Sequence, residues 1–184
     1  MSPSRYTLRI EGPDGKTLES KLPSVTEILD KVLAKNGLPD WYYKQAVSGF
    51  GTLLGKYGTL PSDLRSLHSL MKSEGLSPYA ARDSAAAQGV AIHKAVESLA
   101  KGGKPEKFSE LTAWWKAKKL KRSLILGAEQ LVYSAKHGYA GTVDLVYQDP
   151  EMGDTVLADI KTGNLRDSHE LQLELYRWAW EERA

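Results

Sequence analysis

The chain has 184 residues, of which 41% are hydrophobic and 26% are charged, and its formal net charge is +2 at pH 7. These values are typical of a soluble globular protein, and the length suits one domain with its own hydrophobic core. The absence of cysteine excludes disulfides, thiolate zinc sites, catalytic thiols and iron–sulfur clusters. No apolar run approaches the length of a membrane span and none follows Met1–Arg5, so we expect no membrane association, no signal peptide and a cytoplasmic location.

The first segment is predicted to be a β-hairpin. Residues Tyr6–Glu11 alternate between apolar and polar side chains, and Lys16–Lys21 provides a second run of the same kind. Asp14-Gly15 between them is a frequent turn sequence of hairpins. We therefore expect an appendage of two antiparallel strands within residues 1–22, to which we assign no chemistry.

Residues 24–122 are predicted to be mainly helical. Ser24 and Glu27 have the spacing of a capping box at the start of the first helix, and apolar residues then recur at helical spacing up to Leu33. Lys35-Asn36-Gly37 is expected to end this helix.

A second helix is expected from Asp40 to about Ser48, with Pro39 next to its first turn. Gly49–Gly58 contains four glycines and matches no phosphate-binding fingerprint. We therefore predict a flexible connection there.

Three further helices are predicted over Pro61–Lys72, Ser77–Ala100 and Ser109–Lys121. The second is rich in alanine and carries His93 among apolar residues. A histidine in that setting is usually a hydrogen-bonded core residue, so the residues alone leave a metal ligand and a core residue both open. The many lysines between Lys101 and Arg122 form either a solvated face or a surface that offsets nucleic-acid phosphates.

Three short apolar runs follow, at Gln130–Ala135, Thr142–Gln148 and Val156–Lys161, with turn residues between them. We expect them to form the small mixed central sheet of an α/β fold, flanked by helices. Ser168 is predicted to cap a closing helix, so that residues 124–184 hold the sheet and this helix.

Charged residues interrupt two of these runs. Asp144 lies in the second run, and Asp159 and Lys161 share one face of the third because side chains alternate along a strand. A buried carboxylate is costly unless a cation meets it. If the second and third strands are neighbours, Asp144 and Asp159 converge, and their oxygens suit Mg²⁺ or Mn²⁺. The alternative is a salt bridge between Lys161 and either carboxylate.

The order of these residues resembles the PD-(D/E)XK nuclease superfamily. The most similar branch holds RecB-type nuclease domains, mitochondrial genome maintenance exonucleases and many phage exonucleases. A lone D-x-K pattern is weak, whereas the ordered set of motifs is specific. The matching segments are Ser24-Val25-Thr26 followed by Trp41, Gly89-Val90-Ala91-Ile92-His93, Gly141-Thr142-Val143-Asp144, Asp159-Ile160-Lys161-Thr162-Gly163 and Gln172-Leu173-Glu174-Leu175-Tyr176. Val143 stands where the superfamily name has proline, a replacement that this branch tolerates.

The resemblance implies a restriction-endonuclease-like core and roles for individual residues. The metal ligands that it implies are His93, Asp144, Asp159, the backbone carbonyl of Ile160 and Glu129. The catalytic set that it implies comprises Asp144, Asp159, Lys161, Gln172 and Tyr176. On the residues alone, Glu129 at the start of the first strand is equally an edge-strand charge. Gln172 and Tyr176, four residues apart, are equally an ordinary helix surface contact.

We therefore expect residues 1–184 to form a single nuclease domain that hydrolyses phosphodiester bonds in DNA with Mg²⁺ or Mn²⁺. The resemblance favours an exonuclease acting on single-stranded ends in recombination, repair or phage DNA processing, with DNA and a recombination or repair protein as partners. The alternatives are a structure-specific or restriction-like endonuclease, a nucleic-acid-binding module without catalysis, and a structural protein without a cofactor.

Overall fold

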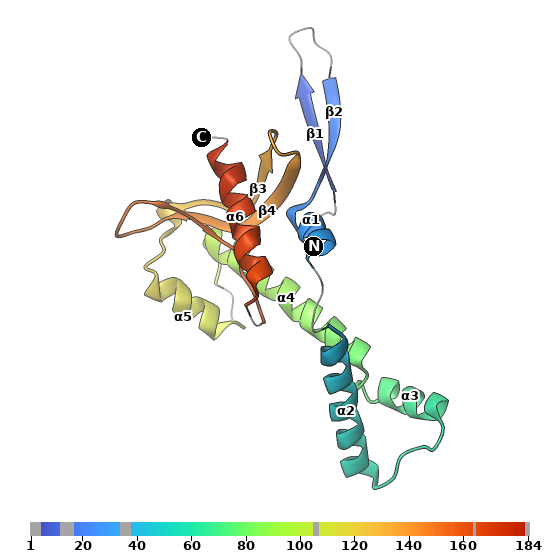
Figure 1. The fold of residues 1–184 in the computed structure, drawn as a ribbon. Coiled ribbons are helices and arrows are strands. Elements are labelled where there is room, and N and C mark those ends of the chain that lie inside the picture. Colours follow the sequence, from blue (N-terminus) through green and yellow to red (C-terminus); the bar gives the residue numbers. More distant parts are fainter. Residues whose placement is uncertain (1–4, 12–16, 34–37, 105–106, 164, 183–184) are drawn as a thin grey trace. The chain divides into compact units, whose positions relative to one another are not determined.

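The computed structural model describes residues 5–11, 17–33, 38–104, 107–163 and 165–182 (Figure 1). These residues form an α/β protein with two small antiparallel sheets. The elements in chain order are β1 (Arg5–Glu11), β2 (Thr17–Pro23), α1 (Val25–Val32), α2 (Leu38–Tyr57), α3 (Leu64–Ser73), α4 (Pro78–Ala100), α5 (Ser109–Ala117), a short 3₁₀ helix (Arg122–Leu124), β3 (Ile125–Ser134), β4 (Tyr139–Gln148), β5 (Thr155–Ala158) and α6 (Asp167–Glu181).

The backbone contacts divide the chain into two compact units. One unit comprises Met1–Leu33 and Val90–Ala184, and the other comprises Ala34–Gly89. All strands belong to the first unit, which also holds α1, α5, α6 and the second half of α4.

The predicted N-terminal hairpin is confirmed. Strands β1 and β2 pair antiparallel from Arg5 opposite Pro23 to Glu11 opposite Thr17. The Tyr6 hydroxyl lies 2.9 Å from Oγ1 of Thr142 on β4, so one hydrogen bond joins the hairpin to the larger sheet. The predicted turn at Asp14-Gly15 lies outside the described residues.

The larger sheet has the strand order β3-β4-β5 with antiparallel pairing throughout. A mixed sheet was expected, but within the described residues parallel pairing is limited to an isolated bridge between Ser24 and Ala140. The connections explain the difference, because β3 joins β4 and β4 joins β5 through short turns that can only link antiparallel neighbours.

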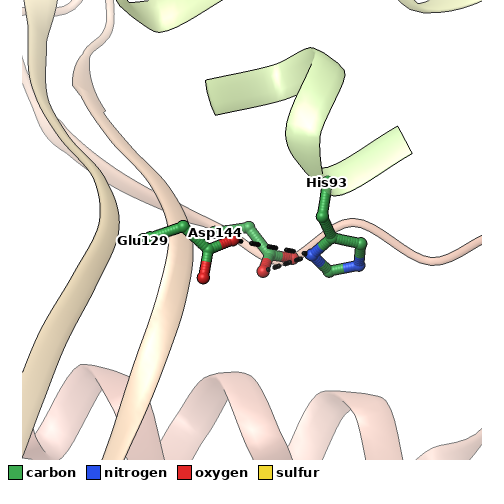
Figure 2. Close-up of side chains that lie close together, drawn as sticks. All are labelled: His93, Glu129 and Asp144. Carbon is green, nitrogen blue, oxygen red and sulfur yellow. Dashed lines mark ion pairs between the residues drawn. The ribbon is translucent and has the colours of Figure 1, made fainter. Parts of the chain in front are cut away.

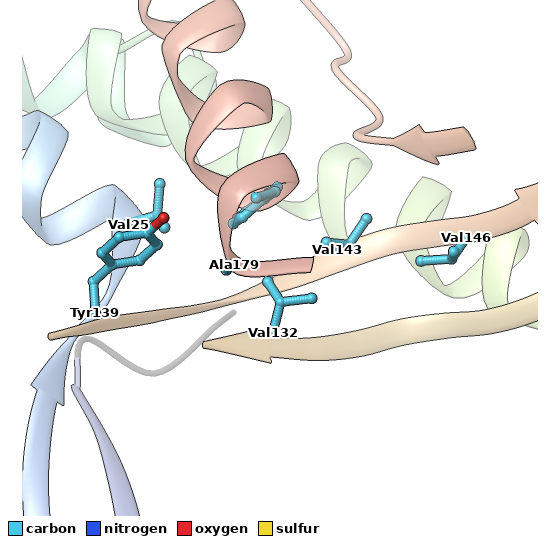
Figure 3. Packing of buried hydrophobic residues seen from close by; sticks show 7 residues of the cluster. Val25, Val132, Tyr139, Val143, Val146 and Ala179 are labelled. Atoms are coloured by element: carbon cyan, nitrogen blue, oxygen red, sulfur yellow. The ribbon is translucent and has the colours of Figure 1, made fainter. Parts of the chain in front are cut away.

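Two clusters of buried side chains cover the two faces of this sheet. The first joins α1 and α6 to the sheet and is shown in Figure 3; it comprises Val25, Val132, Tyr139, Val143, Val146, Tyr176 and Ala179. The second joins the sheet to α4 and α5 and comprises Val96, Ala100, Trp115, Leu120, Leu145 and Tyr147. The sheet therefore lies between two helical layers, and its central strand β4 is buried along almost its whole length.

The first helix begins as the sequence predicts. Oγ of Ser24 accepts a hydrogen bond of 3.0 Å from the backbone N–H of Glu27, which satisfies one of the free N–H groups at the start of α1. The helix ends at Val32. The predicted stop signal Lys35-Asn36-Gly37 lies outside the described residues.

The unit Ala34–Gly89 contains α2, α3 and the first half of α4. The prediction of a flexible connection at Gly49–Gly58 is wrong, because α2 continues through Tyr57. An added Cβ on Gly49 would lie 2.6 Å from the carbonyl oxygen of Leu76, so this glycine permits close packing. Leu53 is fully buried. Packing of this kind compensates the roughly 1 kcal/mol that each glycine costs in a helix.

Several helix boundaries differ from the prediction. Helix α5 ends at Ala117, and Lys119 with a φ of 52° turns the chain away from the helical path before the predicted end at Lys121. Helix α6 has its N-cap at Arg166 instead of Ser168. Helix α4 runs to Ala100 as predicted. None of the helices in the described ranges combines the length and apolar character of a membrane span.

The alternating burial of β3 gives a direct test of the sheet packing. Val132 is fully buried and Leu131 is 45% exposed. We expect Val132→Ala to lower the free energy of unfolding by about 2 kcal/mol, because two methyl groups leave the core and a cavity remains. Leu131→Ala, the matched control, should cost about 1 kcal/mol or less. Urea denaturation measures both, and equal losses would contradict the assigned faces of β3.

Candidate metal centre and cleft

The two ladders of the larger sheet bring three carboxylates to neighbouring positions. The β4–β5 ladder ends at the pair of Leu145 and Ala158, so the next residues in register are Asp144 and Asp159. In the β3–β4 ladder, the partners of Leu145 and Val143 flank Glu129. Glu129 is therefore in register with Asp144. Neighbouring strands lie about 4.8 Å apart. Glu129 and Asp144 are therefore neighbours on β3 and β4, and Asp159 directly follows the end of β5. We call these three carboxylates the acidic row.

The sequence prediction of adjacent second and third strands is confirmed, but the bounds of the third strand are wrong. Strand β5 ends at Ala158, and Asp159, Ile160 and Lys161 continue without strand pairing. The backbone N–H of Ile160 instead donates to Oδ2 of Asp144 at 2.6 Å. The Asp144 side chain thus binds a backbone group that a ladder would otherwise pair.

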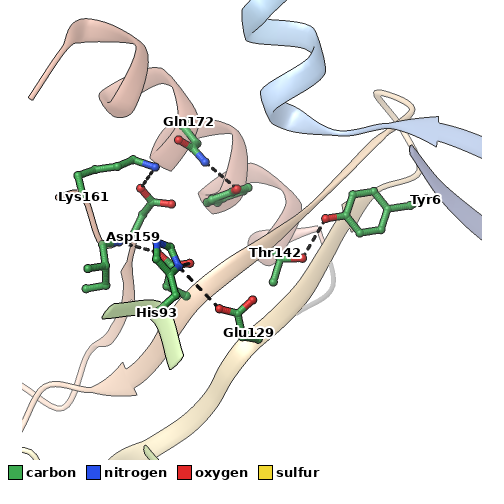
Figure 4. Close-up of polar contacts among 10 residues, drawn as sticks. Tyr6, His93, Glu129, Thr142, Asp159, Lys161 and Gln172 are labelled. Atoms are coloured by element: carbon green, nitrogen blue, oxygen red, sulfur yellow. Dashed lines mark hydrogen bonds and ion pairs between the residues drawn. The ribbon is translucent and has the colours of Figure 1, made fainter. Parts of the chain in front are cut away.

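Asp159 and Lys161 contact each other through an ion pair of Oδ2 and Nζ (Figure 4). The Asp159 side chain is 5% exposed, and burial raises the pKa of its carboxyl although the Lys161 ammonium opposes that shift. The hypothesis of a metal site and the hypothesis of a simple salt bridge both predict this ion pair. The distinction between them therefore depends on the residues around Asp144.

His93 on α4 faces the acidic row, as Figure 2 shows. Its Nδ1 lies 2.9 Å from Oδ1 of Asp144 and 3.8 Å from Oε1 of Glu129. The hydrogen bond to Asp144 raises the pKa of His93 despite partial burial of the ring. One ligand atom from each of these three residues lies within 4.8 Å of the others. His93 is thus close enough to share a metal ion with two members of the row.

Glu129 has an unusual backbone. It lies inside β3 and not at the start of the strand as predicted, and its φ is 50°. A non-glycine residue in this left-handed region costs on the order of 1 kcal/mol or more, and such residues concentrate at functional sites. Burial and the nearby Asp144 raise the pKa of its carboxyl. The left-handed backbone thus occurs at the residue of β3 whose carboxylate lies 3.8 Å from Nδ1 of His93.

Gln172 and Tyr176 on α6 form the predicted pair. Nε2 of Gln172 donates to the Tyr176 hydroxyl at 2.8 Å. Tyr176 is 3% exposed, and burial raises its pKa. A Cβ on Gly141 would lie 2.4 Å from Cε1 of the Tyr176 ring. The glycine of one motif therefore makes room for the tyrosine of another.

These residues surround one cleft with a volume of about 530 Å³, within the range of ligand pockets. The lining residues are Ser24, Thr26, Glu27, Asp30, Lys31, His93, Thr142, Asp144, Asp159, Lys161, Gln172 and Tyr176. Of the predicted site residues, Glu129 and Ile160 do not line this cleft, although each lies next to Asp144.

The α1 side of the cleft is the part that sequence reasoning missed. Glu27 was assigned only a role in the capping box, and Asp30 and Lys31 were assigned none, although the spacing of the three places them on one helical face. Nζ of Lys31 lies 2.7 Å from Oε1 of Glu27. Ser24 is the residue from which this side of the cleft could have been predicted. It caps the start of α1 and also lines the cleft.

The residues of the row fit a hard divalent cation. The donor set whose atoms lie within 4.8 Å of one another is the two carboxylates of Glu129 and Asp144 and the imidazole of His93, without thiolates, which suits Mg²⁺ or Mn²⁺. Among the described residues, the cationic groups in contact with the row are His93 and Lys161. Burial and like-charge repulsion raise the pKa of Asp159 and of Glu129, and a bound cation would relieve both. A ligand role for the Ile160 carbonyl stays a prediction.

Comparison of the chain with protein-family models, with curated proteins and with solved structures found no match. The resemblance to a nuclease superfamily therefore depends on the motifs and on the geometry described above.

The contact between Gly141 and Tyr176 can be tested by substitution. We expect Gly141→Ala to lower the free energy of unfolding by about 1–3 kcal/mol, because the added methyl group overlaps the Tyr176 ring. Gly163→Ala, where a Cβ meets nothing within 4 Å, is the matched control and should cost about 0.5 kcal/mol or less. The double variant Gly141→Ala/Tyr176→Ala should lose less than the sum of the single losses. Additive losses in urea denaturation would contradict the contact.

Metal binding should release a proton near neutral pH. His93 has a raised pKa and so carries a proton below that pKa, whereas a metal ligand must be neutral. The affinity for Mn²⁺ should therefore fall as the pH drops through the His93 pKa, by up to about tenfold per pH unit. Calorimetry at about pH 6, below the ordinary histidine pKa of about 6.5, in two buffers of different ionisation enthalpy measures the released proton. Identical binding heats would exclude His93 as a ligand, and His93→Gln should remove the buffer dependence while His137→Gln should not.

Proposed function

We propose that the protein is a metal-dependent deoxyribonuclease with a restriction-endonuclease-like core, which removes nucleotides from single-stranded DNA ends with Mg²⁺ or Mn²⁺. One observation carries the proposal, namely that the acidic row meets His93 and Lys161 beside a single cleft. We propose that this activity takes place in the cytoplasm and serves recombination, repair or phage DNA processing. A protein of one of these processes would be its partner.

The cation would be held by Asp144 and Asp159, with His93, Glu129 and the carbonyl of Ile160 as further ligands. A divalent ion at such a site lowers the pKa of water and polarises a phosphoryl oxygen. The buried position of Asp144, at 6% exposure, supports this role because its hydrogen bonds to His93 and Ile160 fix both carboxylate oxygens.

Lys161 provides the positive charge at the reacting phosphate. Its side chain is 24% exposed and lines the cleft, while the ion pair with Asp159 holds the ammonium in place. An ammonium donates up to three hydrogen bonds, so Nζ can bind Asp159 and still orient the attacking water or a phosphate oxygen. A charge held in a partly buried site stabilises the negative charge that develops during phosphoester hydrolysis.

Gln172 supplies a neutral donor in the same cleft. Its amide nitrogen has two N–H bonds, of which one is directed to the Tyr176 hydroxyl. The second N–H and the side-chain carbonyl are then oriented for a phosphate oxygen or a water. Tyr176 is fixed by burial against Gly141, so the amide of Gln172 is held in one rotamer.

The preference for a single-stranded substrate comes from the resemblance to the exonuclease branch. The cleft volume of about 530 Å³ accommodates a group of nucleotide size. The restriction-like endonuclease stays an alternative, and a circular single strand distinguishes the two because only an endonuclease cleaves it.

Digestion of end-labelled single-stranded DNA in Mg²⁺, Mn²⁺ or EDTA tests the proposal. We expect nucleotide release with either metal and none in EDTA. Lys161→Ala should lower kcat by about 100-fold or more, because one stabilising charge is lost at the transition state. DNA binding in EDTA should change by less than about threefold. Lys136→Ala, an exposed lysine in the turn between β3 and β4, is the matched control and should leave kcat unchanged.

Cleavage by Lys161→Ala at the rate of the unaltered protein would remove Lys161 from the mechanism. Absence of cleavage of linear and circular DNA in both metals would contradict the nuclease proposal as a whole.

A further inference from the structure

His169 is a half-buried residue in the first turn of α6 to which the sequence motifs assign no role. It precedes Gln172 by three residues and Tyr176 by seven, so the three side chains share one face of the helix. Gln172 and Tyr176 line the cleft together with Lys161. His169 lies outside the cleft lining itself, one helical turn before Gln172 on the same face of α6.

The hydrogen bonding of the ring determines its protonation. The backbone N–H of Arg166 donates to Nδ1 of His169 at 3.3 Å. A ring nitrogen that accepts a hydrogen bond carries no proton, so the imidazole is neutral and its proton is on Nε2. The ring thus uses one nitrogen to hold the start of α6 and retains Nε2 as a donor.

The charges around His169 agree with this assignment. Burial lowers the pKa of His169, and the nearby Lys161 ammonium lowers it further, whereas Asp159 acts in the opposite direction. Arg166 also disfavours the protonated ring. The ring is therefore within electrostatic reach of the Asp159–Lys161 pair.

We propose that His169 binds the substrate directly, by donating a hydrogen bond from Nε2 to a phosphate oxygen of the DNA strand beside Lys161. A phosphate accepts several hydrogen bonds, and a neutral donor next to an ammonium adds a contact without further charge repulsion. Asp167 and Glu170 in the same turn are exposed and disfavour an anion, but their positions place them on other faces of α6. This inference rests on the proposed function and assigns one phosphate contact within it.

Two substitutions separate a substrate contact from a role confined to the helix terminus. Glutamine at position 169 places its amide nitrogen near the position of Nε2 but lacks an acceptor near Nδ1. Asparagine places its carbonyl oxygen near the position of Nδ1 but does not reach the position of Nε2. His169→Gln should therefore retain DNA binding and lose stability, and His169→Asn should retain stability and lose binding. His169→Ala should lose both.

Binding is measured in EDTA by fluorescence anisotropy, with a labelled single-stranded oligonucleotide as the probe. We expect His169→Ala and His169→Asn to raise Kd by about tenfold, the effect of one hydrogen bond to a charged group. His169→Gln should remain within about threefold of the unaltered protein. His137→Ala, which alters an exposed histidine in the turn between β3 and β4, is the control and should leave Kd unchanged.

A second readout follows the ring itself. Titration with thymidine monophosphate should shift the His169 ring signals in nuclear magnetic resonance spectra while those of His137 stay fixed. Unchanged Kd in His169→Ala, or an unaltered protein that does not bind the oligonucleotide in EDTA, overturns the inference. Cleavage is scored separately with Mg²⁺, so binding through His169 without any cleavage would instead contradict the proposed function and leave the contact standing.

Discussion

Three carboxylates gather at one place beside a small sheet, and their closeness costs free energy. The rest of the structure is arranged around this cost. The β3–β4 register places Glu129 beside Asp144, and Asp159 directly follows β5. Burial and neighbouring carboxylates disfavour the charged forms of Glu129 and Asp159. Lys161 supplies positive charge to Asp159, and His93 from α4 contacts Asp144. Such an arrangement is expensive for folding alone, which is the physical reason to infer a bound cation.

The surrounding elements keep the row in place. The sheet is packed on one face by α1 and α6 and on the other by α4 and α5, so that β4 is held rigidly between two cores. The Gly141–Tyr176 contact connects β4 to α6, and Tyr176 in turn accepts a hydrogen bond from Gln172 beside the cleft. The cleft is thus formed by elements that also build the core.

The sequence predicts much of this arrangement and misses parts that depend on tertiary contacts. The turns between the apolar runs predict neighbouring strands, and the pairing of β4 with β5 confirms this; Asp144 and Asp159 both line the cleft. The strained backbone of Glu129 and the hydrogen bond from Ile160 to Asp144 depend on the folded sheet and have no local signal. The glycines of Gly49–Gly58 suggest flexibility locally, but packing of α2 overrides that preference.

The most direct test of the central claim is an anomalous difference map at the manganese edge from crystals soaked in Mn²⁺. The account predicts a peak about 2.0–2.3 Å from carboxylate oxygens of Asp144 and Asp159, the usual distance range for a small divalent cation and oxygen. A map without a peak at the acidic row, or with manganese bound only elsewhere on the protein, would contradict it.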